Sequence, residues 1–67
     1  SNLFVALRDV PAGVPMTLEA VRKAGVRVEE QERGGLLLQV LDEHHEHDVL
    51  QHVREVAGVV GVAVVHG

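Results

Sequence analysis

The chain has 67 residues, a net charge of −4 and no cysteine, so we expect one small domain without disulfides or a thiolate metal site. Its basic residues are scattered and Phe4 is its one aromatic residue, which argues against nucleic-acid binding because that needs basic patches and stacking rings. The longest apolar run, residues 56–65, is shorter than the roughly 20 residues that span a bilayer. We therefore expect a cytoplasmic domain with no nucleic-acid partner and no membrane contact of its own.

The first apolar run, Leu3–Leu7, predicts a central strand that is covered on both faces. Residues 1–2, Ser-Asn without a methionine, are typical of a cloning remnant, so residues 3–67 are expected to be a single domain excised from a longer protein. Residues 9–13 contain a proline and a glycine and predict a loop.

A first helix is expected to end at Gly25, because glycine suits the left-handed position after a helix. Its start has two interpretations. Pro15 can occupy the first helical position, or Thr17 can be the N-cap. In both cases Leu18 and Val21 lie on the buried stripe.

Residues 26–33 alternate in polarity and residues 36–41 return as a second strand, with a Gly-Gly turn between them. In this register Val28 lies opposite Leu41, so Leu37 and Leu41 share the helix-covered face. A longer loop would exchange the faces of one strand. The apolar residues left on the opposite face are Leu36, Leu38 and Val40.

A polar connection, residues 42–48, leads to a second helix that Asp48 is expected to cap and Gly58 to end. Residues 59–65 then form a last strand that is apolar on both faces. The order strand–helix–strand–strand–helix–strand predicts an α+β ferredoxin-like (βαββαβ) two-layer sandwich. It has a four-stranded antiparallel sheet in the order 4-1-3-2, with both helices on one face. The stripe of the second helix comprises Val49, Leu50, Val53, Val56 and Ala57.

Two helices cover one face of such a sheet, yet three of the four strands are apolar on both faces. Single apolar residues are ordinary on protein surfaces, but a stripe across adjacent strands marks an interface. We therefore expect a homodimer formed through the open sheet face or a sheet edge, or docking on the parent chain. The acidic residues of 29–32 fit a solvated edge strand whose charge blocks aggregation.

Four segments resemble the ACT domain family. The resemblance implies a small module that binds an amino acid and regulates an attached enzyme or transcription factor. It spans nearly the whole chain, but its motifs are degenerate. The segments are residues 9–14, similar to the family's Asp-x-Pro-Gly-x-Leu turn; residues 24–28, similar to Ala-Gly-Ile-Asn-Ile; the apolar pattern of residues 49–56; and residues 56–62, similar to Pro-Gly-Val-x-x-Val.

The resemblance also implies a ligand site. It places Asp9 near a ligand amino group and the backbone of Gly13 and Val14 near its carboxylate, because helix N-termini bind anions. Two departures bear on this site: Ala12 adds a residue to the turn, and Arg27, which is also expected to bind the ligand, stands where the family has Asn. Ordinary turn chemistry is the alternative interpretation of the loop.

A second candidate site lies in residues 42–48, where His44, His45 and His47 alternate with carboxylates. Imidazole and carboxylate together suit Zn²⁺, Ni²⁺ or Cu²⁺. If the helix begins early, His45 and His52 share a face two turns apart. The alternative is a solvated connection whose acids favour the coming helix N-terminus. A divalent transition metal is therefore the one cofactor that the sequence offers, and otherwise none is expected.

Catalysis by this chain is not expected. Its hydroxyl residues are Ser1 and Thr17, and the sequence offers no nucleophile–base pair. The chain is thus predicted to be an amino-acid-binding regulatory and dimerisation module of ACT type, which can act on an attached enzyme. The alternatives are a metal-binding sensory or transporter-tail domain of the same fold that uses the histidines, or dimerisation alone.

Overall fold

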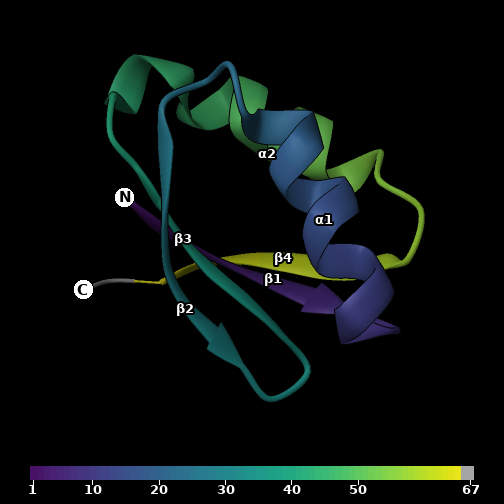
Figure 1. Cartoon of the computed structure of the whole chain (residues 1–67). Helices are drawn as coiled ribbons and strands as arrows, with labels where there is room; N and C mark the ends of the chain where they lie inside the picture. Colours follow the sequence, from purple (N-terminus) through teal and green to yellow (C-terminus); the bar gives the residue numbers. More distant parts are fainter. Residues whose placement is uncertain (66–67) are drawn as a thin grey trace.

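The computed structural model describes residues 1–65, with the side chains of residues 29–32 left out. Figure 1 shows two helices over one face of a four-stranded sheet whose order is β2-β3-β1-β4. The pairs β2–β3, β3–β1 and β1–β4 are all antiparallel. The predicted fold class and strand order are confirmed. The elements are β1 (Asn2–Leu7), α1 (Val10–Val21), β2 (Val26–Glu32), β3 (Gly35–Val40), a 3-10 turn η1 (Glu43–His45), α2 (Glu46–Arg54) and β4 (Val59–Val65).

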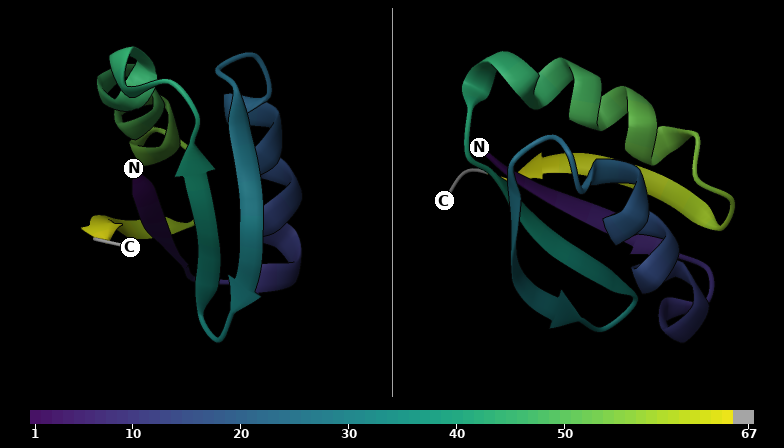
Figure 2. Two further views of the ribbon diagram at one scale, coloured as in Figure 1. Left: turned by 90° about the vertical axis from the view of Figure 1, so that its left-hand side faces the viewer. Right: turned by 45° about the horizontal axis from the view of Figure 1, so that its top comes forward.

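The core lies between the sheet and the two helices. Figure 2 shows α1 on the side of β2 and β3, and α2 above the side that ends in β4. The helices meet each other as well as the sheet, so one apolar layer serves all the elements. Its buried apolar residues are Leu3, Val5, Leu7, Val14, Val21, Leu36, Leu38, Val40, Val49 and Val53.

Helix α1 begins earlier than either sequence interpretation placed it. Asp9 is the N-cap, and its Oδ1 accepts from the Ala12 amide at 3.5 Å. Residues 9–13 are therefore not a loop, and Pro15 lies inside the helix. Thr17 is fully buried rather than a cap. The helix ends at Val21, before Gly25, whose φ of +70° belongs to the turn into β2.

The predicted register of the β2–β3 hairpin is wrong, and the faces of β3 are exchanged. Val28 lies opposite Leu38 instead of Leu41, so Leu36, Leu38 and Val40 face the helices. The turn is Arg33-Gly34, and Gly35 belongs to β3. A bulge between Val28 and Glu30 shifts the remaining pairs. The face without helices is therefore less apolar than expected.

Gly35 explains why the turn falls one residue earlier. A side chain at this position would stand 2.6 Å from the Phe4 ring and also overlap the carbonyl oxygen of Val5. The strand pair β1–β3 can therefore close only around a glycine. Gly34 supplies the positive φ, +82°, that the turn requires.

Helix α2 also begins earlier than predicted. Asp42 caps the preceding 3-10 turn, and its Oδ1 accepts from the His44 amide at 3.0 Å. Asp48 therefore lies within the first turn of α2 and is not its cap. The predicted apolar stripe is confirmed at Val49 and Val53, which are buried, while the helix ends at Arg54, before Val56.

Candidate functional site

The residues predicted to bind a ligand lie at two opposite ends of the sheet. Asp9 follows the end of β1 and caps α1. Arg27 lies opposite Gln39, which in turn lies opposite Asn2 at the start of β1. The structure therefore does not gather the predicted residues into one site, and a ligand-binding role for any of them stays a prediction.

The helix N-terminus that was expected to receive a carboxylate is already in use. Gly13 and Val14 are buried in α1, and the Gly13 amide donates to the carbonyl of Asp9 at 2.8 Å. The space beside Gly13 is filled by the side chain of Leu7, which lies 2.9 Å from the position of a Cβ. Packing of α1 on β1 thus accounts for this glycine without a ligand.

The three predicted metal-binding histidines diverge. His44 Nδ1 lies 3.2 Å from Asp42 Oδ1, and its side chain is almost fully exposed. His45 Nδ1 lies 3.1 Å from the carbonyl oxygen of Ala24, and His47 is exposed. Within the described residues, no group of three or more His, Asp or Glu side chains is placed to hold a metal. Metal binding by these histidines stays a prediction.

His45 instead faces a shallow hollow of about 340 Å³ between the last turn of α1 and the start of α2. His52 lies in the same hollow, as the shared helix face predicts, and its Nδ1 is 2.6 Å from the Asp48 carbonyl oxygen. Carbonyls only accept, so in both histidines Nδ1 carries the proton. The sequence had not placed α1 in this hollow. Its lining residues are Glu19, Ala20, Arg22, Lys23, Ala24, His45, Asp48 and His52.

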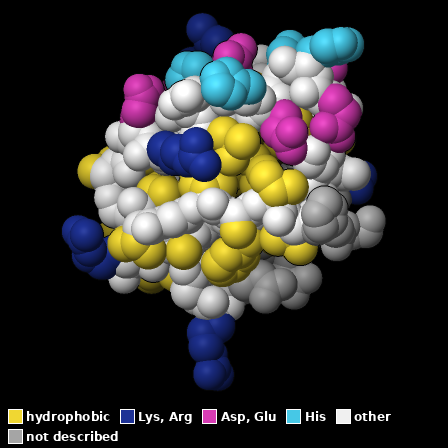
Figure 3. Space-filling model, turned by 180° about the vertical axis from the view of Figure 1, so that it is seen from behind, with side chains coloured by type: hydrophobic (Ala, Val, Ile, Leu, Met, Phe, Trp, Pro, Cys, Tyr) yellow, Lys and Arg dark blue, Asp and Glu magenta, His cyan; other side chains and the backbone are white. Residues whose placement is uncertain are grey.

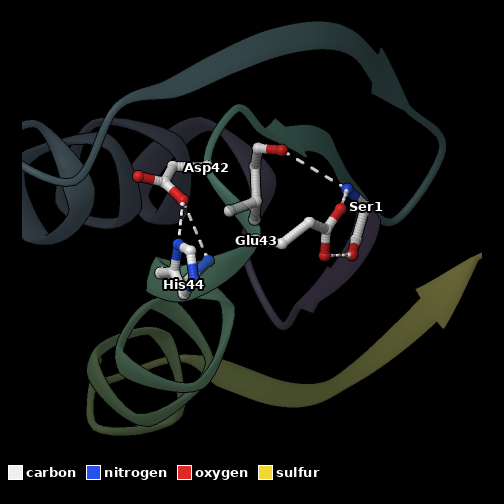
Figure 4. A network of polar contacts seen from close by, with 5 residues as sticks. Ser1, Asp42, Glu43 and His44 are labelled. Carbon is white, nitrogen blue, oxygen red and sulfur yellow. Dashed lines mark hydrogen bonds and ion pairs between the residues drawn. The ribbon is translucent and has the colours of Figure 1, made fainter.

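A second polar cluster joins the start of the chain to η1, as Figure 4 shows. The amino group of Ser1 lies 2.6 Å from Glu43 Oε1, and the Ser1 hydroxyl donates to Oε2 at 2.8 Å. The amine, and then the hydroxyl, lower the pKa of Glu43 because both stabilise its ionised form. These contacts place residues 1–2 against the fold, whereas their assignment as a cloning remnant stays a prediction.

The most distinctive apolar surface is β4, the strand at one edge of the sheet. Val60, Val64 and Val65 are 59%, 48% and 39% exposed. From behind, Figure 3 shows hydrophobic side chains gathered across the middle of the molecule, with histidine and acidic side chains above them. Figure 2 places β4 on that side, remote from β2. The sequence predicted both an apolar last strand and its place at an edge of the sheet, and the structure adds which of its valines are exposed.

Comparison with known proteins gives one consistent similarity. Over 28 residues the chain is 64% identical to the large-conductance mechanosensitive channel of Polaromonas naphthalenivorans, 68% to that of Thiobacillus denitrificans and 61% to that of Cupriavidus metallidurans. The aligned part is 42% of this chain, and the chain spans about a fifth of the length of these relatives. No protein-family model matches the chain. No solved structure matches it either.

This similarity corrects four predictions. It points to a channel and not to the ACT domain family, so the predicted amino-acid-binding regulatory function is wrong. Metal sensing and dimerisation alone gain no better support as functions. A cytoplasmic location is contradicted as well, because a channel acts in a membrane. The prediction that this chain has no membrane contact also disagrees with its similarity to membrane channels, although the similarity covers only the aligned part of the chain.

Two coarser expectations agree with the similarity. The relatives are channels and not enzymes, and this is compatible with the expectation that the chain is not an enzyme. Association with further copies is also compatible with it.

Neither α1 nor α2, the helices of the described chain, combines the length and the apolar character that crossing a membrane requires.

Proposed function

We propose that this chain is part of a channel-type membrane protein related to the mechanosensitive channels and forms a folded domain beside the membrane. The observation that carries the proposal is the identity of 61–68% over 28 residues with channels of several organisms. Because the aligned part is 42% of the chain, the proposal concerns a role within such a protein and not conduction by this domain alone.

The charge distribution supports a position in water beside the bilayer. The outward surface of α2 carries exposed charged side chains, including Asp48 and Arg54, while α1 has Glu19 and is followed by Arg22 and Lys23. Charged groups are costly in lipid, so the helix layer requires hydration.

We further propose that copies of the domain associate, through the open sheet face or through a sheet edge. The open face carries Phe4 and Leu37, both half-buried, beside small residues such as Ala6 and Gly61. The edge strand β4 exposes three valines. Clustered apolar surface at an edge favours association because its burial removes that surface from water.

The test of channel membership is a segment exchange. In the channel of Polaromonas naphthalenivorans, the 28 aligned residues are replaced by the corresponding residues of this chain, and tension-gated currents are recorded from liposome patches. We expect currents at a tension close to that of the parent channel, because 64% of the segment is unchanged. Survival of osmotic downshock by cells that lack other such channels provides a second measurement.

The control replaces the same segment by a shuffled sequence of identical composition, which is expected to abolish gating. If the exchanged segment performs no better than the shuffled one although both proteins reach the membrane, the similarity carries no function and the proposal fails.

A further inference from the structure

We propose that two copies of this chain pair through the free edges of their β4 strands, antiparallel about a two-fold axis, to form one continuous eight-stranded sheet. The inference rests on the proposed self-association and identifies the surface that produces it. In the described chain, β4 is hydrogen-bonded to β1 on one side and to no strand on the other. A strand edge of this kind presents a row of unpaired backbone donors and acceptors to a second strand.

The side chains of β4 are compatible with pairing to themselves. The strand runs Val-Val-Gly-Val-Ala-Val-Val over residues 59–65 and carries no charge and no proline, two of the features by which edge strands resist pairing. Its one irregularity is at Val60, where the register against β1 shifts. Antiparallel pairing centred on Val62 overlaps all seven residues and brings Val60 of each copy opposite Val64 of the other. These two are the most exposed valines of the strand, and cross-strand pairs of β-branched residues stabilise sheets.

Val64 shows that the helix layer stops short of this edge. It lies opposite Leu3, which is fully buried on the helix-covered face, and yet Val64 is 48% exposed. Neighbouring strands in a sheet are spaced by about 4.8 Å, and packed helices by about 8–10 Å between their axes. One helix therefore covers nearly the same width as two strands. Edge pairing would therefore set the α2 helices of the two copies side by side at ordinary packing distance, directly above the exposed valines.

The charges of α2 favour the same arrangement. Its first turn contains Glu46 and Asp48, and its last turn contains His52 and Arg54. A two-fold axis that makes the β4 strands antiparallel also makes the neighbouring α2 helices antiparallel. The acidic turn of each copy then meets the basic turn of the other, which fits a second copy as the occupant of this edge.

The other edge of the sheet does not fit this role. Strand β2 contains Arg27 and three glutamates in its seven residues. Pairing β2 of one copy with β4 of another would be heterologous and would leave a free edge at each end, which leads to open filaments. Pairing of β4 with β4 consumes both apolar edges and stops at two copies.

The test compares two valines on opposite edges of the sheet. Val64 in β4 and Val28 in β2 are 48% and 42% exposed, and both lie opposite buried leucines. We expect sedimentation of the full chain to give a mass of twice 7.2 kDa. Val64→Lys should raise the dissociation constant at least about tenfold, because a lysine on an edge strand blocks pairing. Val28→Lys should leave it unchanged.

A cross-linking measurement decides the case even if a lysine variant does not fold. The chain has no cysteine, and residues opposite each other across an antiparallel pair have Cα atoms about 4.5–5.5 Å apart, within disulfide range. Val62→Cys at the axis should therefore oxidise to a disulfide-linked dimer. Leu37→Cys on the open face should not.

Each contrary result has a distinct meaning. A wild-type chain that stays monomeric up to millimolar concentration overturns both the edge pairing and the proposed self-association. A dimer that survives Val64→Lys, or that cross-links through Leu37→Cys in place of Val62→Cys, overturns edge pairing and leaves self-association through another surface.

Discussion

The two edge strands of the sheet, β2 and β4, differ in their content of charged residues. Strand β2 is rich in charge and joins β3 through a tight turn. Its pairing with β3 is interrupted by a bulge next to Val28. Strand β4 is of the same length but has no charged residue at all. Each exposes one valine by nearly half on the helix-covered side, Val28 and Val64. The two strands thus differ in whether their sequence prevents a further strand from adding to the edge.

This difference shows that the exposed surface of a small sheet is not equally available for association. A strand sequence rich in charge resists the addition of a further strand, because charges are costly to desolvate in an interface. Strand β4 has no such cost. The following predictions test whether the two edges differ as described.

The largest effect is expected in β3, which fixes the position of β2. Leu38→Ala should lower the free energy of unfolding by about 2–5 kcal/mol, because Leu38 is fully buried and its truncation leaves a cavity. Leu37→Ala should cost far less, since Leu37 is half-buried on the open face. Chemical denaturation of both variants measures the difference. Equal losses would mean that the register of β3 is wrong. Val28 would then not lie opposite a buried leucine, and it would no longer be a matched control for Val64.

A smaller loss of stability is expected when a glycine is replaced in an inner strand, β3, and it can be compared with the same replacement in the edge strand β4. Gly35→Ala in β3 should cost about 1–3 kcal/mol or more, because its Cβ meets the backbone of Val5, which cannot move aside as a side chain can. Gly61→Ala in β4 should be nearly neutral, since no atom lies within 4 Å of the new methyl group. Melting temperatures provide the comparison, at about 4–8 °C per kcal/mol for a domain of this size. A severe loss in Gly61→Ala would show that β4 is already covered.

A still smaller effect compares the helices over the two edges. Thr17 in α1 is fully buried, and its Oγ1 has no hydrogen-bond partner, whereas α2 buries valine at positions 49 and 53. Thr17→Val should therefore stabilise the chain by about 1 kcal/mol, because it replaces an unsatisfied hydroxyl by a methyl group while the shape of the side chain stays similar. Val53→Thr should destabilise it by about 1–3 kcal/mol for the converse reason. No gain in Thr17→Val would indicate that its hydroxyl is satisfied in solution.

The order of elements and the order of strands could be predicted from the sequence because both follow from local patterns of polarity. The start of α1 was missed although Asp9 and Pro11 carry the signal of a cap followed by a proline in the first turn. The segment was interpreted as a turn because the same residues are also common there. This error came from weighing local signals and not from missing information.

The register of β3 could not be obtained in that way. It depends on the ring of Phe4 and the carbonyl of Val5, which exclude a side chain at Gly35 although they lie about thirty residues away in the chain. Glycines at 34 and 35 look equivalent in sequence, and a shift of one residue exchanges the faces of the strand. The arrangement of the candidate metal site could not be obtained in that way either, because neighbours in sequence such as His44 and His45 turn to different partners, Asp42 and Ala24.

The smallest effect concerns the β1–β4 side of the sheet in acid. The amine of Ser1 holds the pKa of Glu43 below its ordinary value, so the ionised carboxylate contributes stability at neutral pH that is lost as the pH falls through the lowered pKa. Asn2, next to this contact, lies opposite Val65 at the end of β4. We therefore expect acid to speed amide exchange at that end of β4 before it affects the β2–β3 hairpin. Acetylation of the amine should raise the pKa of Glu43 in an NMR titration, and Glu43→Gln should remove the pH dependence. If acetylation leaves that pKa unchanged, the contact does not persist in solution, and the two edges respond to acid alike.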